Sequence, residues 1–161
     1  LINGVSKTYA MTGWRIGFII GPTELTGAMS RIQGASTSGV CSIAQAAACA
    51  ALNGPQDKAQ EMHAHFKERR DLMFEGLSAL PQVSVVKPEG AFYIFPDFQH
   101  YVGGPLRTSL ELCEYLLEEA LVASVAGSGF GAEGFIRMSF ATSNAEIEQA
   151  LTRIAKALKQ I

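Results

Sequence analysis

Lys7 and Arg15 are the two residues of this sequence whose types and spacing most directly suggest chemistry. Both lie in a segment of small and flexible residues, GVSKTYAMTGWRIG, which begins at Gly4 and ends at Gly17. An amine held in a partly desolvated pocket near another cation is a nucleophile at neutral pH and forms an imine with an aldehyde. A guanidinium is always charged and forked, which suits a phosphate. The pair therefore fits a small molecule that carries both an aldehyde and a phosphate, as pyridoxal phosphate does.

Spacing alone leaves a second interpretation open. Lys7 would then be a solvated loop lysine and Arg15 an arginine at a strand edge, because both residue types are mostly found at protein surfaces. The wider segment favours the first interpretation. It places a small residue, an apolar residue and Ser6 before Lys7, and Arg15 is followed by an apolar residue and Gly17. This pattern resembles the lysine-site signature of class I and II aminotransferases, which are pyridoxal phosphate enzymes of fold type I. The variant SKTYAMTGWRIG is most similar to the bacterial aspartate aminotransferase-like branch of that family.

The resemblance implies a role for each residue of this segment. Lys7 would hold pyridoxal 5′-phosphate covalently and then move a proton at the substrate α-carbon as general base and acid. Arg15 would neutralise the phosphate, with Ser6 assisting. The reaction implied is transamination in amino acid metabolism, with aspartate and 2-oxoglutarate as the favoured amino acid and 2-oxo acid.

Arg137 is a third candidate, in the segment GFIRMSFAT. On a strand it shares a face with Phe135 and Ser139, while Ile136 and Met138 point the other way. A guanidinium on a largely apolar strand is costly unless an anion meets it. An edge arginine that faces water or pairs with a local carboxylate is the alternative.

The same resemblance extends to the second half of the chain. Arg137 matches the small-domain arginine that holds the α-carboxylate of the amino acid in a two-pronged salt bridge. The turn Gly90-Ala91-Phe92-Tyr93 is similar to the small-domain turn that closes over substrate. We expect Phe92, rather than Tyr93, to face the substrate.

The remaining sequence must position these residues, and it predicts an α/β chain. We expect a remnant of a large cofactor-binding domain over 1–54. Residues 55–161 would form an α+β small domain, with a long connecting helix and helices on one face of a small mixed or antiparallel sheet. Apolar spacing, turn residues and capping signals predict helices over 23–34, 42–52, 56–80, 108–120 and 143–161, and strands over 15–20, 83–86, 91–95, 121–126 and 135–140.

Composition excludes several other classes of protein. A net charge of -2 gives no electrostatic case for nucleic acid or an anionic membrane, and no apolar run is long enough to span a bilayer. Cys41, Cys49 and Cys113 lack paired metal-ligand spacing and indicate reduced packing cysteines in a cytoplasmic protein. No metal site is expected. The glycines between Gly129 and Gly134 match a dinucleotide fingerprint, but a strand rather than a helix follows them, so they predict a flexible turn.

The sequence begins at Leu1, directly before the lysine segment. By the resemblance, this is the C-terminal part of an aminotransferase that forms a homodimer when complete, and we expect the part alone to be inactive. Two alternatives stay open. One is the aminotransferase-like domain of a transcription regulator, which a winged-helix segment upstream would indicate. The other is a decarboxylating or C–C bond-forming relative of the same fold, which product analysis would separate.

Overall fold

Two short antiparallel strands flank the segment that carries Lys7 and Arg15 in the computed structural model, which describes residues 1–161. β1 (Ile2–Gly4) pairs with β2 (Gly17–Ile19), so that Gly4 lies opposite Gly17. A Cβ atom added to Gly4 would lie 2.9 Å from the carbonyl oxygen of Ile16, so a larger residue would push the strands apart at this point.

The strand predicted over 15–20 is therefore shorter in the structure. Arg15 is not part of it, because its backbone adopts a left-handed conformation (φ 54°) at the end of the 3-10 helix η1 (Thr12–Trp14). The connection between the strands is thus a folded turn rather than an extension of either strand.

Two helices complete this part of the chain. α1 (Thr23–Ser36) runs past the predicted end at residue 34 and has no buried residue. α2 (Ser42–Asn53) confirms the helix predicted over 42–52, and it buries Ala44 and Ala48. These alanines pack in a small core with Val5 and Ile16, which lie on either side of the lysine–arginine segment. The packing of small side chains thus holds the two ends of that segment against α2.

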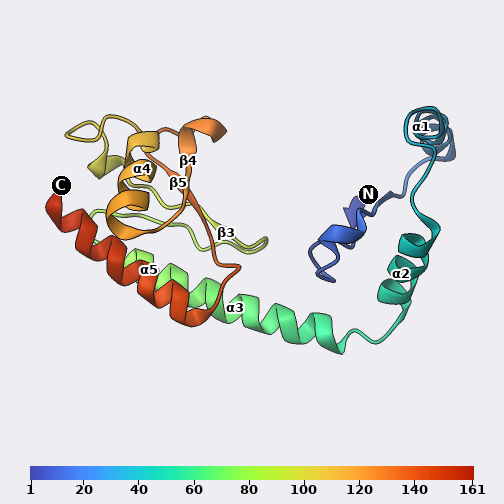
Figure 1. Cartoon of the computed structure of the whole chain (residues 1–161), viewed down its shortest axis with the longest axis horizontal. Coiled ribbons are helices and arrows are strands. Elements are labelled where there is room, and N and C mark those ends of the chain that lie inside the picture. Colours follow the sequence, from blue (N-terminus) through green and yellow to red (C-terminus); the bar gives the residue numbers. More distant parts are fainter. The chain divides into compact units, whose positions relative to one another are not determined.

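Contacts divide the chain into two compact units, Leu1–Met62 and His63–Ile161. The division falls inside α3 (Asp57–Ser78), whose presence confirms the long helix predicted over 56–80. α3 is the green helix in Figure 1. The division into a large-domain remnant over 1–54 and a small domain over 55–161 stays a prediction about the complete protein.

The second unit contains a three-stranded antiparallel sheet in the order β3-β5-β4. Its strands are β3 (Tyr93–Ile94), β4 (Val125–Ala126) and β5 (Ile136–Ser139). α4 (Ser109–Ala120), α5 (Asn144–Ala157) and the C-terminal part of α3 pack around a core shared with the sheet (Figure 1). This confirms the predicted small antiparallel sheet with helices. The largest side chains buried in this core are Phe98, Phe140, Leu77, Ile94, Leu112, Leu116, Ile136 and Ile154.

Several predictions for this unit differ from the structure in detail, and the strand predicted over 91–95 is reduced to β3. No strand forms over 83–86, where Ser84 makes only an isolated bridge to Asp97. The strand predicted over 121–126 is reduced to β4, because Leu121 adopts a left-handed conformation (φ 54°) at the end of α4. The turn predicted between Gly129 and Gly134 is present from Gly131 onward, while Gly129 belongs to the 3-10 helix η3 (Gly127–Phe130). Two further 3-10 helices are η2 (Gln99–Tyr101) and η4 (Leu158–Gln160).

Both predicted helix caps are present. The Thr108 hydroxyl accepts a hydrogen bond from the Glu111 backbone N–H at the start of α4. At the start of α5, the Ser143 hydroxyl accepts from the Glu146 N–H at 3.3 Å, and the Glu146 carboxylate accepts from the Ser143 N–H at 3.2 Å. Hydrogen bonds from Thr142 and Ser143 hold the pKa of the Glu146 carboxyl below its ordinary value, so this capping box is strongest while Glu146 is ionised.

Replacing Ser143 by alanine should lower the free energy of unfolding of the second unit by about 1 kcal/mol, because the first turn of α5 loses its capping acceptor. Urea unfolding followed by circular dichroism would measure this difference. Thr152→Ala is the control, since the Thr152 hydroxyl only donates back to the Glu148 carbonyl within α5. An equal loss of stability in both variants would contradict the capping role.

No helix in the structure combines the length and the apolar character that a transmembrane segment requires.

Candidate active site

Lys7 lies in the turn that follows β1 and is exposed, two residues after the fully buried Val5. Its backbone carbonyl accepts a hydrogen bond from the Ala10 N–H at 3.2 Å, which closes the turn. Val5 anchors the chain in the small core of the first unit, so the amine is carried by a turn with one fixed end. Lys7 is thus exposed, which differs from the partly desolvated environment that the sequence analysis considered for a nucleophilic amine.

A short series of hydrogen bonds connects the neighbour of Lys7 with Arg15. The Thr12 hydroxyl donates to the Ser6 carbonyl at 3.0 Å, and Arg15 Nη1 donates to the Thr12 carbonyl at 3.1 Å. The Arg15 N–H also donates to the Thr12 carbonyl at 3.4 Å. The connection between β1 and β2 is therefore cross-braced, and it carries Lys7 and Arg15 at the same end of the two-stranded sheet.

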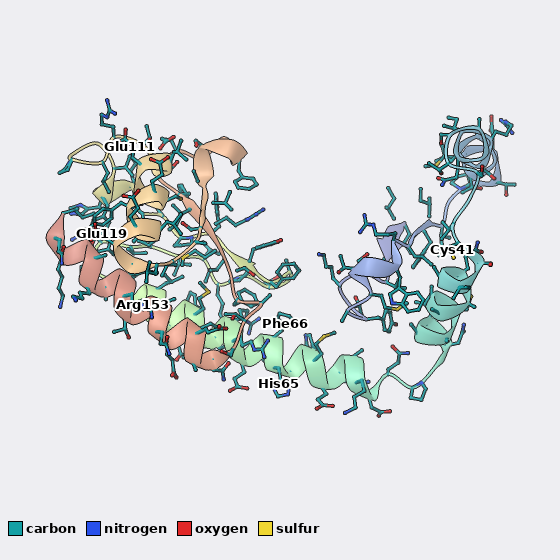
Figure 2. The ribbon with its side chains drawn as sticks, in the orientation of Figure 1. Cys41, His65, Phe66, Glu111, Glu119 and Arg153 are labelled. Carbon is teal, nitrogen blue, oxygen red and sulfur yellow. The ribbon has the colours of Figure 1, made fainter.

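Arg15 also lines a hollow of about 900 Å³ in the first unit, together with Trp14, Gln33 and Cys41. Lys7 is not among the residues that line it. Cys41 precedes α2 (Figure 2), and the N–H groups of Ala44 and Ile43 lower the pKa of its thiol. The sequence prediction that the cysteines are packing residues is wrong for Cys41 and Cys49, which are exposed, and right for Cys113, which is buried.

Arg137 lies on β5 with buried neighbours on both sides, Ile136 and Met138. This confirms the predicted alternation of the strand. The guanidinium carbon is 4.4 Å from the ring centroid of Tyr93 and 4.9 Å from that of Phe130. None of the ion pairs of the structure involves it. A partly buried guanidinium that stacks on aromatic rings and lacks an anion within the chain is suited to bind an anionic ligand.

Phe92 and Tyr93 lie in different environments. Phe92 directly precedes β3, and Tyr93 is its first residue. The Phe92 ring lies 6.3 Å from that of Phe66 on α3 (Figure 2) and packs against the core of the second unit. Tyr93 supplies the ring that contacts Arg137. The substrate-facing role predicted for Phe92 stays a prediction, and Tyr93 joins the candidate residues.

Tyr93 and Phe130 are partners of Arg137 that were not predicted from the sequence. The contact with Tyr93 follows from strand pairing: β3 pairs with β5 in a register that sets Tyr93 opposite Ser139, one side-chain position from Arg137 on the same face. Both strands were predicted, but their pairing was not. Phe130 has no such pairing, since it reaches the arginine from η3, outside the sheet.

The structure brings the predicted site residues together in two groups. Ser6, Lys7 and Arg15 share one connection in the first unit. Phe92 and Arg137 belong to the second unit, on the paired segments around β3 and β5. The first group offers an amine and a cation, and the second offers a cation with aromatic walls.

Comparisons with known proteins agree on one family. The family model described as aminotransferase class I and II matches residues 1–154. The aspartate aminotransferase of Rhizobium meliloti strain 1021 is 49% identical over 166 residues, which cover 99% of this chain and 40% of that protein. The probable aspartate/prephenate aminotransferase of Aquifex aeolicus is 46% identical over 162 residues, covering 99% of this chain and 41% of that protein.

Solved structures give the same result. The crystal structure of the aspartate aminotransferase from Rhizobium meliloti matches 98% of this chain with a TM-score of 0.92 and 49% identity, over 41% of its own length. An aromatic aminotransferase from Pyrococcus horikoshii matches 99% of this chain with a TM-score of 0.91 and 37% identity, over 42% of its own length. The chain thus spans about 40% of the length of the curated relatives it matches.

Proposed function

Since the chain belongs to the class I and II aminotransferases, we propose that the complete protein transfers an amino group from an amino acid to a 2-oxo acid. Aspartate and 2-oxoglutarate are the proposed substrates. The relatives named as aspartate and aspartate/prephenate aminotransferases support the choice of aspartate. The placement of Lys7 and Arg15 in one braced connection between β1 and β2 is the observation that carries the proposal.

The family uses pyridoxal 5′-phosphate, and the residues of the first unit fit this cofactor. Lys7 is an exposed primary amine, the group that condenses with an aldehyde. Arg15 is an exposed guanidinium that donates one hydrogen bond, from Nη1 to the Thr12 carbonyl, and its other N–H groups remain for a phosphate. Ser6 would assist Arg15 through its hydroxyl. When bound, the cofactor supplies an electron-poor ring that stabilises negative charge at the substrate α-carbon.

The candidate site residues would perform distinct tasks in the reaction. The Lys7 amine would take the proton from the substrate α-carbon and return it, which is general base and acid catalysis. Arg137 would bind the α-carboxylate in a two-pronged contact and so orient the α-carbon, with Phe92 as part of the wall around the substrate. Positioning by Arg137 and proton transfer by Lys7 should therefore be separable by mutation.

The test is a transamination assay of the complete protein with aspartate and 2-oxoglutarate. Equal amounts of oxaloacetate and glutamate are expected, because each amino group that leaves aspartate is transferred to one 2-oxoglutarate. Release of carbon dioxide from the amino acid as the main product would instead show a decarboxylating relative. Cofactor binding without turnover of any amino acid would favour the regulator.

Replacing Arg15 by alanine should weaken cofactor binding by about 10- to 100-fold, because a charge-assisted contact to the phosphate is lost. Equilibrium dialysis of the complete protein against pyridoxal phosphate would measure the dissociation constant. Arg31→Ala is the matched control, since Arg31 is an exposed arginine of α1 in the same unit. Unchanged cofactor affinity in the Arg15 variant would show that this arginine is structural.

We also propose that the complete protein is a cytoplasmic homodimer. α1 supports an assembly, because it buries none of its residues although Leu25, Met29 and Ile32 are large apolar side chains. Exposed apolar side chains gathered on one helix are typical of surfaces that are covered, which in the complete protein means the remainder of the chain or a second subunit.

A further inference from the structure

We propose that Phe130 is a positioning residue that holds the guanidinium of Arg137 in place for a substrate carboxylate. This inference rests on the carboxylate-binding role proposed above for Arg137. The two aromatic rings near the guanidinium come from different elements, Tyr93 from β3 and Phe130 from η3. Tyr93 is fixed by the pairing of β3 with β5, so Phe130 is the independent part of the arrangement.

The contacts of the guanidinium determine what remains available to a ligand. Its carbon lies 4.4 Å and 4.9 Å from the Tyr93 and Phe130 centroids, within the range of cation–π attraction. Aromatic rings attract a guanidinium without using its N–H donors as a carboxylate would. No ion pair of the structure uses those donors. The stacked arginine is therefore restrained and still able to bind a carboxylate with two N–H groups.

Other aromatic rings support Phe130. The Phe95 ring meets it edge to face, with centroids 5.9 Å apart and an interplanar angle of 84°. Phe95 in turn stacks on Phe135, with centroids 5.2 Å apart and an angle of 24°. These geometries are favourable for aromatic pairs. The Phe130 ring thus has a fixed contact on the side of Phe95, although 52% of the residue is exposed.

Hydrogen bonds fix the backbone that carries Phe130. The Gly127 N–H donates to the Phe135 carbonyl at 2.8 Å, and the Ala132 N–H donates to the Gly127 carbonyl at 3.0 Å. The Ser128 N–H donates to the Ser109 hydroxyl at 3.3 Å, which connects η3 to the start of α4. A Cβ atom at Gly127 would collide with the carbonyl oxygens of Ala132 and Phe135. The segment is therefore a tight support rather than a mobile loop.

Restraint of the Arg137 side chain should affect substrate binding more than the catalytic step. A free arginine side chain samples many rotamers and must lose that freedom when it grips a carboxylate. Phe130 removes part of this loss before the substrate arrives. Its effect should therefore appear in the KM for both substrates, because both carry the α-carboxylate, and little in kcat.

The experiment compares Phe130→Ala and Phe130→Leu in the complete, cofactor-loaded protein. Both variants should raise the KM for aspartate and for 2-oxoglutarate by about 2- to 10-fold, with kcat and the cofactor dissociation constant nearly unchanged. Phe130→Tyr, which keeps the ring, should restore the KM. Leu117→Ala is the control, since Leu117 is also 52% exposed and lies on α4. An unchanged KM in Phe130→Leu would overturn the inference.

A double-mutant cycle shows whether Phe130 acts through Arg137. In an Arg137→Ala background, Phe130→Ala should have no further effect on KM, because no guanidinium remains to be positioned. A full additional effect would overturn this inference and leave the role of Arg137 intact. If Arg137→Ala itself left the KM unchanged, the carboxylate-binding role and this inference would both fall.

Discussion

Lys7→Ala in the complete protein is expected to lower kcat for transamination by about 10²- to 10⁴-fold from loss of proton transfer alone. The effect should be larger in total, because the covalent attachment of the cofactor is lost with the same amine. Steady-state assay with aspartate and 2-oxoglutarate would measure the loss. Addition of a small primary amine should recover a part of the rate, since an external base then replaces the missing one.

Chemical trapping gives an independent check on Lys7. Borohydride reduction of the cofactor-loaded protein, followed by digestion and mass spectrometry, should place the adduct on Lys7. Lys58→Ala is the control, because Lys58 is 92% exposed and its amine pairs with Glu61 on the same helix. An adduct on Lys58 or Lys67 would contradict the assignment of Lys7.

Arg137→Ala is expected to raise the KM for amino acid and 2-oxo acid substrates by about 30- to 5,000-fold. Removing one partner of a desolvated, two-pronged carboxylate contact costs about 2 to 5 kcal/mol of binding free energy. Cofactor absorbance should be nearly unchanged, because Arg15 and Lys7 are the residues proposed to bind the cofactor. Steady-state kinetics with both substrates would measure the change.

Two comparisons test whether the loss is specific to the carboxylate. Arg107→Ala should leave the KM unchanged, since Arg107 is 81% exposed and pairs with Glu111 at 2.6 Å. Simple amines without a carboxylate should react equally with the wild-type and Arg137→Ala proteins. An equal loss with those amines would show that Arg137 supports the fold instead.

The features predicted correctly from sequence are those that local signals determine. Thr108 and Ser143 precede their helices at capping spacing, and both hydroxyls accept the expected N–H. The alternation around Arg137 was also predicted correctly, because successive strand residues point to opposite sides and Ile136 and Met138 are buried. Long apolar periodicity likewise predicted α3 and α5.

The features that sequence reasoning missed depend on contacts between distant residues or on single backbone angles. The left-handed conformations of Arg15 and Leu121 shorten two predicted strands. Neither arginine nor leucine favours a positive φ angle, so the residue types do not predict these conformations. The stacking of Phe130 on Arg137 depends on where η3 lies beside the sheet. Hydrophobic periodicity carries no information about either, because it reports only which face of an element is buried.

The left-handed backbone of Arg15 has a consequence for protein engineering. Glycine adopts this conformation freely, whereas a residue with a side chain holds it at a cost of about 1 kcal/mol or more. A screen that rewards only heat resistance would therefore favour Arg15→Gly. The same exchange would delete the guanidinium proposed to bind the phosphate. Selection for thermal stability would thus favour glycine at this position, whereas selection for catalytic activity would favour arginine. A mutant library should therefore keep Arg15 fixed.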